Sequence, residues 1–141
     1  MKTHDTLIPC RFMCTVCFLI ATIMVFSTMP ENIVASLPSK YTESAYNTNS
    51  LSLNFALALN LICLGVSYIG FLGGFSMFLP FVNVVVIISH TIGCIFTCVF
   101  IMEAWHYLTF WYIFLFFSMP VAFLDASIII ATFCLGGLNR L

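Results

Sequence analysis

Two ionisable side chains lie within uncharged, apolar stretches of the sequence, where they could take part in chemistry. Asp125 lies in the apolar stretch that ends near Leu135, and His90 lies within the uncharged run 44–102. A carboxylate at mid-bilayer costs about 3 kcal/mol or more, so it faces the interior of a helix bundle and pairs there. We therefore predict an intramembrane polar pair of His90 and Asp125. It is either a packing contact, favoured because two groups are few for a transport path, or a proton relay or ion site.

Cysteines are the second group of reactive side chains, and the sequence has seven of them. Cys14 and Cys17 form a C-x-x-C at the start of an apolar stretch. A membrane thiol oxidoreductase of the vitamin K epoxide reductase type would also need cysteines in the polar loop at 30–50, which has none. Cys10 lies beside the apolar stretch and is a candidate for palmitoylation. No four ligands converge in the pattern expected of a zinc site, so no metal is predicted.

The sequence contains no recognisable catalytic set of side chains. It shows no Ser/His/Asp arrangement, no phosphate-binding glycine loop and no close pair of carboxylates, so we predict neither an enzyme nor a bound cofactor. Lysine and arginine together number four and form no basic patch, which excludes a nucleic-acid-binding protein.

The elements that position these residues are predicted to be membrane helices. Charged residues make up 6% of the chain, against roughly 25% in soluble domains, and hydrophobic residues make up 62%. A membrane-crossing helix needs about 20 apolar residues. The gaps between charges therefore predict an all-α, integral membrane four-helix bundle in the lipid bilayer, a single domain over 1–141, with a kink near Pro120. The spans are expected at about 12–29, 51–74, 80–102 and 107–135.

The basic residues predict the orientation in the membrane. Lys2, Arg11 and Arg140 share the side of the termini, whereas Lys40 lies in the loop on the other side. By the positive-inside rule, both termini are expected to be cytosolic. The first span could instead be a cleaved signal peptide, although no clear small-x-small cleavage site follows it.

Small residues predict which helix faces meet, because membrane helices associate through close packing at such positions. In the second span they follow one helical stripe that ends in a G-x-x-x-G pair. In the third span they recur at steps of four. The candidate helix-packing residues are Ser67, Gly70, Gly74, Ser89 and Gly93. The opposite faces carry bulky apolar side chains suited to lipid.

Aromatic residues crowd the segment 105–117, at the exit of the third span. Such crowding is typical of the aromatic belt that anchors helix ends at the membrane interface. A surface for docking a lipid or a partner protein is the alternative interpretation. The candidate interfacial or partner-docking residues are Glu103, Trp105, Trp111 and Tyr112.

Several segments, in order and at matching spacing, carry a family resemblance. They are Leu7-Ile8-Pro9-Cys10-Arg11-Phe12, Gly70-Phe71-Leu72-Gly73-Gly74-Phe75-Ser76-Met77-Phe78, Phe100-Ile101-Met102-Glu103-Ala104-Trp105 and Trp111-Tyr112-Ile113-Phe114, together with His90 and Asp125. Through them the chain resembles the transmembrane protein 107 family over most of its length.

The resemblance implies a structural role at the ciliary transition zone, in the Meckel syndrome (MKS) module. Members of that family help to recruit other module proteins, including tectonic-type membrane proteins, and so help to control ciliary membrane protein composition and cilium assembly. A bundle with lipid-facing surfaces and an aromatic belt is compatible with such a scaffold. The alternative drawn from the residues alone is a small transporter or channel subunit that uses His90 and Asp125.

Overall fold

The computed structural model describes residues 2–138, and it is an all-helical bundle, as predicted. Its elements are α1 (Lys2–Ala35), α2 (Glu43–Leu72), α3 (Pro80–Met102), α4 (Leu108–Ile113), the π-helix η1 (Phe114–Ser118) and α5 (Met119–Leu138). Within them, four helical segments are long and apolar enough to cross a membrane: Thr6–Ala35, Glu43–Leu72, Pro80–Met102 and Leu108–Gly136. The last of these joins α4, η1 and α5 into one continuous span.

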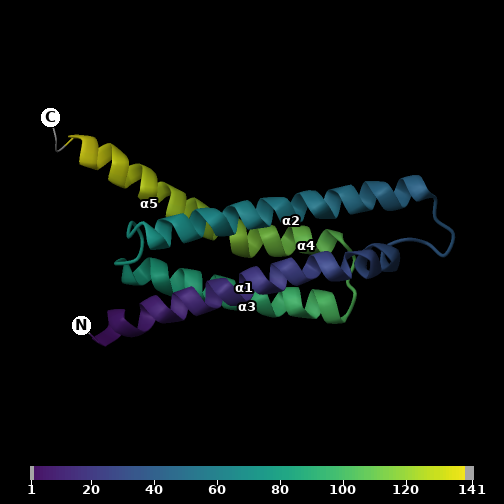
Figure 1. Cartoon of the computed structure of the whole chain (residues 1–141), viewed down its shortest axis with the longest axis horizontal. Helices are drawn as coiled ribbons and strands as arrows, with labels where there is room; N and C mark the ends of the chain where they lie inside the picture. Colours follow the sequence, from purple (N-terminus) through teal and green to yellow (C-terminus); the bar gives the residue numbers. More distant parts are fainter. Residues whose placement is uncertain (1, 139–141) are drawn as a thin grey trace.

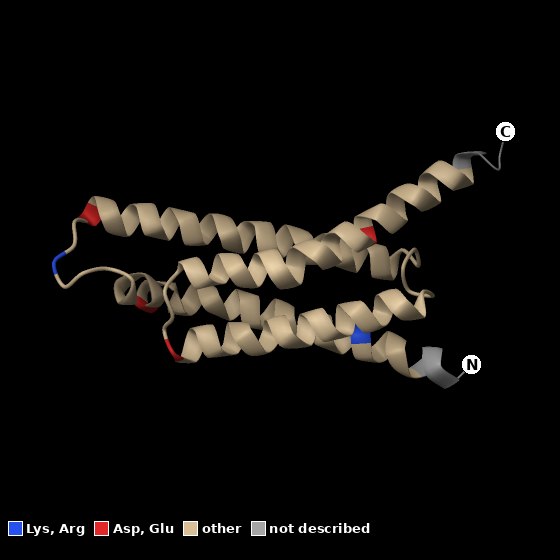
Figure 2. Ribbon diagram, turned by 180° about the vertical axis from the view of Figure 1, so that it is seen from behind, with Lys and Arg blue, Asp and Glu red and all other residues tan. Residues whose placement is uncertain are grey.

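The helices lie side by side in two main pairs. α1 packs chiefly on α3, and α2 packs chiefly on α5. The start of α1 and the end of α5 lie on the same side of the bundle as the α2–α3 turn, while the α1–α2 and α3–α4 loops lie at the opposite end (Figure 1). Charged residues gather at that opposite end and at one level inside the bundle near the α2–α3 turn (Figure 2).

The second helix begins at Glu43, ahead of the start near 51 that its apolar run predicts. Thr42 caps it, because the Thr42 hydroxyl accepts a hydrogen bond from the Ala45 N–H at 3.4 Å. Glu43 in the first turn also complements the positive end of the helix dipole. The polar residues predicted as loop therefore extend the helix, and the α1–α2 connection shortens to residues 36–42.

The break between the second and third spans falls where glycine and proline predict it. The Gly73 N–H closes α2 on the Ile69 carbonyl at 2.9 Å, and Pro80 opens α3 at its first position. Gly74 lies between them with a φ of +74°, a left-handed conformation that favours glycine. Gly74 thus shapes a turn, and a Cβ there would have no described atom within 4 Å apart from those of Gly74 itself and its two chain neighbours. This corrects its predicted place in a helix contact.

The fourth span changes direction just before Pro120. Its π-helix ends where the Met119 N–H bonds to the Phe114 carbonyl, an i to i+5 contact that widens the turn. Proline lacks an N–H and crowds the preceding turn, so a helix usually bends near it. After this segment α5 diverges from the bundle, as the predicted kink requires (Figure 1). Residues 130–136 are all exposed.

The core combines an apolar cluster with a polar layer. Phe18, Leu57, Phe100 and Phe110 from four different helices are fully buried in one cluster. Next to it, the Asn60 amide donates to the Thr22 hydroxyl at 2.9 Å, and the Ser118 hydroxyl donates to the Asn60 carbonyl oxygen. These bonds tie α1, α2 and η1 together inside the bundle.

Gly93 lies at a close contact between α3 and two of its neighbours, α1 and η1. A Cβ there would lie 3.0 Å from Phe18 Cζ and 3.1 Å from Phe117 Cβ, so a larger side chain must displace the Phe18 ring and the base of the Phe117 side chain. Ser89, one turn earlier, is only half-buried. A Cβ at Gly65 on α2, by contrast, would meet no atom within 4 Å.

We expect the substitution Gly93→Leu to destabilise the bundle by about 1–3 kcal/mol, because it overpacks a filled contact. The same substitution at Gly65 should change stability by less than about 0.5 kcal/mol. Unfolding of both purified variants in mixed micelles, followed by circular dichroism, measures the difference. Equal stability of the two variants would contradict the predicted packing role of Gly93.

Candidate functional site: a buried ion pair

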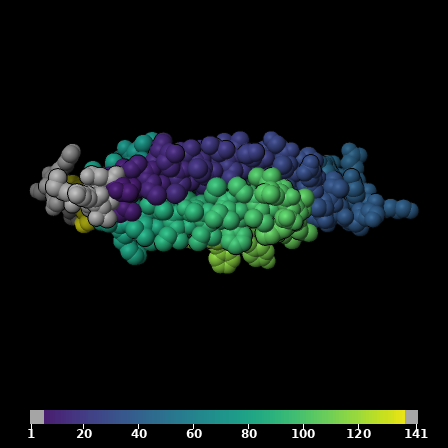
Figure 3. All heavy atoms as spheres, turned by 90° about the horizontal axis from the view of Figure 1, so that it is seen from below, coloured from purple at the N-terminus to yellow at the C-terminus, as the bar shows by residue number. Residues whose placement is uncertain are grey.

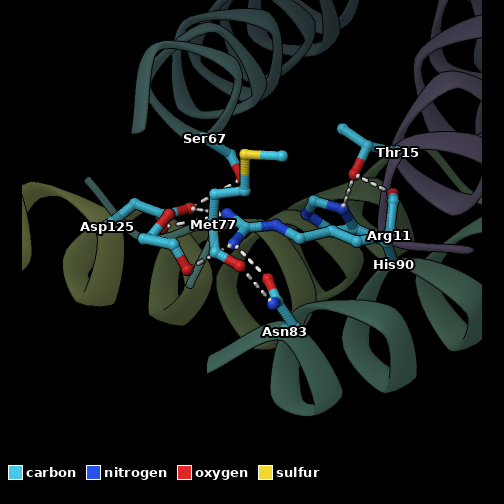
Figure 4. A network of polar contacts seen from close by, with 8 residues as sticks. Arg11, Thr15, Ser67, Met77, Asn83, His90 and Asp125 are labelled. Carbon is cyan, nitrogen blue, oxygen red and sulfur yellow. Dashed lines mark hydrogen bonds and ion pairs between the residues drawn. The ribbon is translucent and has the colours of Figure 1, made fainter. Parts of the chain in front are cut away.

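Arg11 and Asp125 form an ion pair inside the bundle. The Arg11 Nη2 donates to both carboxylate oxygens of Asp125, each at 3.0 Å. The two side chains are 1% and 0% exposed. α1 supplies the arginine and α5 the carboxylate, so the contact joins the first and the fourth spans (Figure 4).

The second helix completes the surroundings of the carboxylate. The Ser67 hydroxyl donates to Asp125 Oδ2 at 2.7 Å. One turn further on, a Cβ at Gly70 would lie 3.2 Å from the Asp125 Cβ, so the bare backbone of glycine lets α5 approach α2 here. Phe71 places its ring 5.3 Å from the Arg11 guanidinium carbon, within cation–π range. Two of the predicted packing residues, Ser67 and Gly70, thus contact Asp125.

The α2–α3 turn and the start of α3 bind the other guanidinium nitrogen. Arg11 Nη1 donates to Asn83 Oδ1 at 2.8 Å and to the Ser76 carbonyl at 3.4 Å. The Asn83 amide in turn donates to the Met77 carbonyl at 2.7 Å. Asn83 therefore orients the arginine and the turn at once (Figure 4). The guanidinium contacts groups from three helices other than its own.

His90 does not pair with Asp125, which corrects the prediction. His90 Nδ1 lies 2.9 Å from the Thr15 hydroxyl, and the Thr15 hydroxyl donates to the Arg11 carbonyl at 2.9 Å. With its proton used in that bond, Thr15 accepts from Nδ1–H. An arginine side chain keeps its charge, so it is the stronger partner for a buried carboxylate. Sequence reasoning missed Arg11 because α1 continues upstream of the predicted span and takes Arg11 into the bundle.

The buried position of Arg11 also affects the predicted orientation. Arg11 is paired inside the bundle, so it is not a free charge at the membrane surface. Arg140 lies outside the described residues. Cytosolic termini therefore remain a prediction.

The aromatic segment divides into inward and outward residues. The Asn32 amide donates to the carbonyls of Phe100 and Trp105, each at 3.0 Å, and so holds the α3–α4 turn. The Trp111 indole donates to the Ser52 hydroxyl at 3.2 Å. Glu103, which ends α3, and Tyr112, which is 62% exposed, point outward. Of the predicted docking set, Trp111 thus bonds within the chain through its side chain, and Trp105 through its backbone carbonyl.

The arrangement suits holding helices in place better than chemistry on a ligand. Arg11 and Asp125 bind each other and their neighbours at close range, and His90 binds Thr15. Among the described residues no group of three or more His, Cys, Asp or Glu side chains could hold a metal ion. The seven cysteines are all free thiols.

Four apolar spans joined by buried polar contacts define a multi-pass membrane protein, for which the bilayer is the solvent. The family model TMEM107, described as a transmembrane protein, matches residues 7–129. The chain belongs to this transmembrane protein 107 family. It is 36% identical to transmembrane protein 107 of Rattus norvegicus and 33% identical to that of Homo sapiens, each over 127 residues that cover 90% of this chain and 91% of the relative. The protein of Danio rerio is 32% identical over 81% of this chain and 84% of its own length. No solved structure matches the chain.

Removal of one partner of the ion pair should be strongly destabilising. We expect Arg11→Met to cost about 3–5 kcal/mol, because it leaves an uncompensated carboxylate in the interior. The double variant Arg11→Met with Asp125→Leu should recover most of that loss, since an apolar pair of similar volume replaces two charges. Reversible unfolding of the four proteins of the cycle in micelles measures the coupling energy. A double variant as unstable as the sum of the two single variants would show that the residues do not interact.

Proposed function

We propose that the chain is a structural membrane component of the MKS module at the ciliary transition zone. There it recruits tectonic-type and other membrane proteins, and helps to control ciliary membrane protein composition and cilium assembly, with both termini in the cytosol. Membership of the transmembrane protein 107 family is the observation that carries the proposal.

The interior of the bundle supports a scaffold over a transport role. Ser67, Arg11 and Asp125 bind one another inside the chain. Because His90 and Asp125 have different partners, a transporter based on that pair is not proposed. Contacts with other proteins are therefore expected on the outer surface of the bundle and on its loops.

The aromatic face of α4 and η1 (the α4–η1 face) is the better of the two docking surfaces considered from the sequence. The Gly70 side of the G-x-x-x-G pair is filled by Asp125 of the same chain, and Gly74 lies in a turn. On the other surface, Tyr112 and Phe116 are 62% and 64% exposed. Beside them a shallow apolar pocket of about 320 Å³ lies over Trp111 and Leu115. Aromatic side chains over such pockets are typical anchors of protein interfaces.

The location is tested with the full chain, tagged at one end, in a ciliated cell that lacks its own copy. We expect the tagged protein to concentrate at the ciliary base, and we expect deletion to change which membrane proteins enter the cilium. Fluorescence imaging and a quantitative inventory of ciliary membrane proteins measure both. A folded protein spread evenly over other membranes, or an unchanged inventory after deletion, would overturn the proposed role.

The docking surface is tested with the double variant Tyr112→Ala and Phe116→Ala. We expect recovery of tectonic-type partners by affinity capture to fall roughly thirtyfold, which corresponds to about 2 kcal/mol, the loss of one hot-spot residue. The matched control is Ile62→Ala with Ile69→Ala, which removes two similarly exposed side chains from α2. Equal capture by both double variants would exclude the α4–η1 face as the docking surface, and would leave the ciliary location untouched.

A further inference from the structure

The turn between α3 and α4, residues 103–107, has a strained backbone. Ala104 has a φ of +46°, a left-handed conformation that residues with a Cβ rarely adopt. The Trp105 N–H donates to the Phe100 carbonyl at 3.2 Å, and the Asn32 amide donates to the carbonyls of Phe100 and Trp105. A strained conformation persists only when its surroundings fix it. The start of the fourth span therefore depends on a small number of hydrogen bonds.

His106 caps the fourth span. The Leu108 N–H donates to His106 Nδ1 at 3.2 Å, and the Thr109 N–H donates to the His106 carbonyl at 2.9 Å. Tyr107 already has helical dihedral angles, φ −53° and ψ −31°, so His106 occupies the position of an N-cap. The usual N-caps are Ser, Thr, Asp and Asn, which accept through an oxygen. Here the acceptor is a ring nitrogen, which can take up a proton.

The cap requires a neutral ring. Because an N–H donates to Nδ1, that nitrogen carries no proton, and the ring proton is on Nε2. In the charged form both ring nitrogens are donors, so Nδ1 can no longer accept from Leu108. The charged ring would also lie at the positive end of the helix dipole. Both effects have the same sign, so the cap is present when the ring is neutral and is lost as the pH falls.

His106 is accessible to protons and is not paired with another charge. Its side chain is exposed, and Figure 3 shows the end of α3 (green) at the surface, far from the start of α1 (purple). The His106 ring stacks on Tyr107 with the ring centroids 4.8 Å apart. The charged side chains at this end of the bundle are all exposed: Glu31, Lys40, Glu43 and Glu103. Over residues 2–138 none of them forms an ion pair with His106.

We propose that His106 is a pH-sensitive cap of the fourth span. Histidine is the side chain that ordinarily changes charge between about pH 5 and pH 8. Protonation releases the Leu108 N–H, loosens the first turn of the span and relaxes the strained turn at Ala104. Leu108 and Trp111 line the shallow pocket on the α4–η1 face, so acid changes that face as well. The effect on partner docking rests on the proposed function, whereas the cap itself does not.

The cap is tested on the purified full chain in phosphatidylcholine nanodiscs, which expose both membrane faces to the buffer. Hydrogen–deuterium exchange of the segment 105–112 is measured by mass spectrometry from about pH 8 to pH 5 and corrected for the intrinsic pH dependence of exchange. We expect protection to fall roughly tenfold, because a cap is lost and a cation is placed at a helix N-terminus. Tryptophan fluorescence should change over the same range, since both tryptophans of the chain, Trp105 and Trp111, lie in this segment.

Three variants separate the cap from other causes of a pH response. His106→Asn keeps an acceptor that does not titrate, so we expect the segment to stay protected in acid. His106→Ala removes the acceptor and should show low protection at both ends of the pH range. The matched control is His4→Asn, the same change near the start of α1 at the other end of the bundle, which should leave the pH response intact.

A His106→Asn protein that still loses protection in acid would overturn the proposal, as would equal protection of the unsubstituted chain at both ends of the pH range. A His106→Ala protein as well protected as the unsubstituted chain near pH 8 would overturn it too. Since no partner is present in this measurement, failure of the capture experiment on the α4–η1 face would leave its result untouched.

Discussion

The contact between Arg11 and Asp125 sets the packing of the whole bundle, because neither charge is tolerated alone where it lies. Removing an ion from water costs several kcal/mol even after relaxation, and only close pairing with further hydrogen bonds offsets that cost. Arginine cannot escape by losing its proton. Any packing that separates α1 from α5 therefore leaves both groups without compensation. The pair adds little net stability by this argument, but it disfavours competing arrangements of four otherwise similar apolar helices.

Other features of the chain make that contact sterically feasible. Gly70 lacks the Cβ that would collide with the Asp125 side chain, so α5 reaches α2 at the level of Ser67. The π-helix before Pro120 inserts a residue into a turn, and each inserted residue rotates the following face by about 100°. That rotation directs Val121, Ala122 and Asp125 inward, where all three are buried. The kink near Pro120, which proline alone would explain, therefore also directs the Asp125 carboxylate into the bundle.

Much of the architecture followed from the spacing of charges, whereas the partner of Asp125 did not. Gaps between charged residues measure apolar length along one helix, and that length decides how many times the chain can span. Which side chain pairs with Asp125 depends on how far the helices are shifted along the membrane normal and rotated relative to one another. A single stretch of sequence does not contain that information. His90 matches Asp125 in depth alone. The signal for Arg11 lies in its permanent charge and its place beside the first span, but the gaps between charges predict a helix start near residue 12, which leaves Arg11 outside the bundle. The second helix starts ahead of its apolar run for a local reason, because Thr42 caps it at Glu43.

A bundle whose interior is occupied by its own contacts can act only through its surface. Among the described residues, the buried side-chain polar atoms without a partner are Asn32 Oδ1 and Ser76 Oγ, so few interior groups remain to bind a ligand. The surface, by contrast, offers an apolar groove along α1 and α3 and the aromatic face of α4 and η1, which belong to different spans.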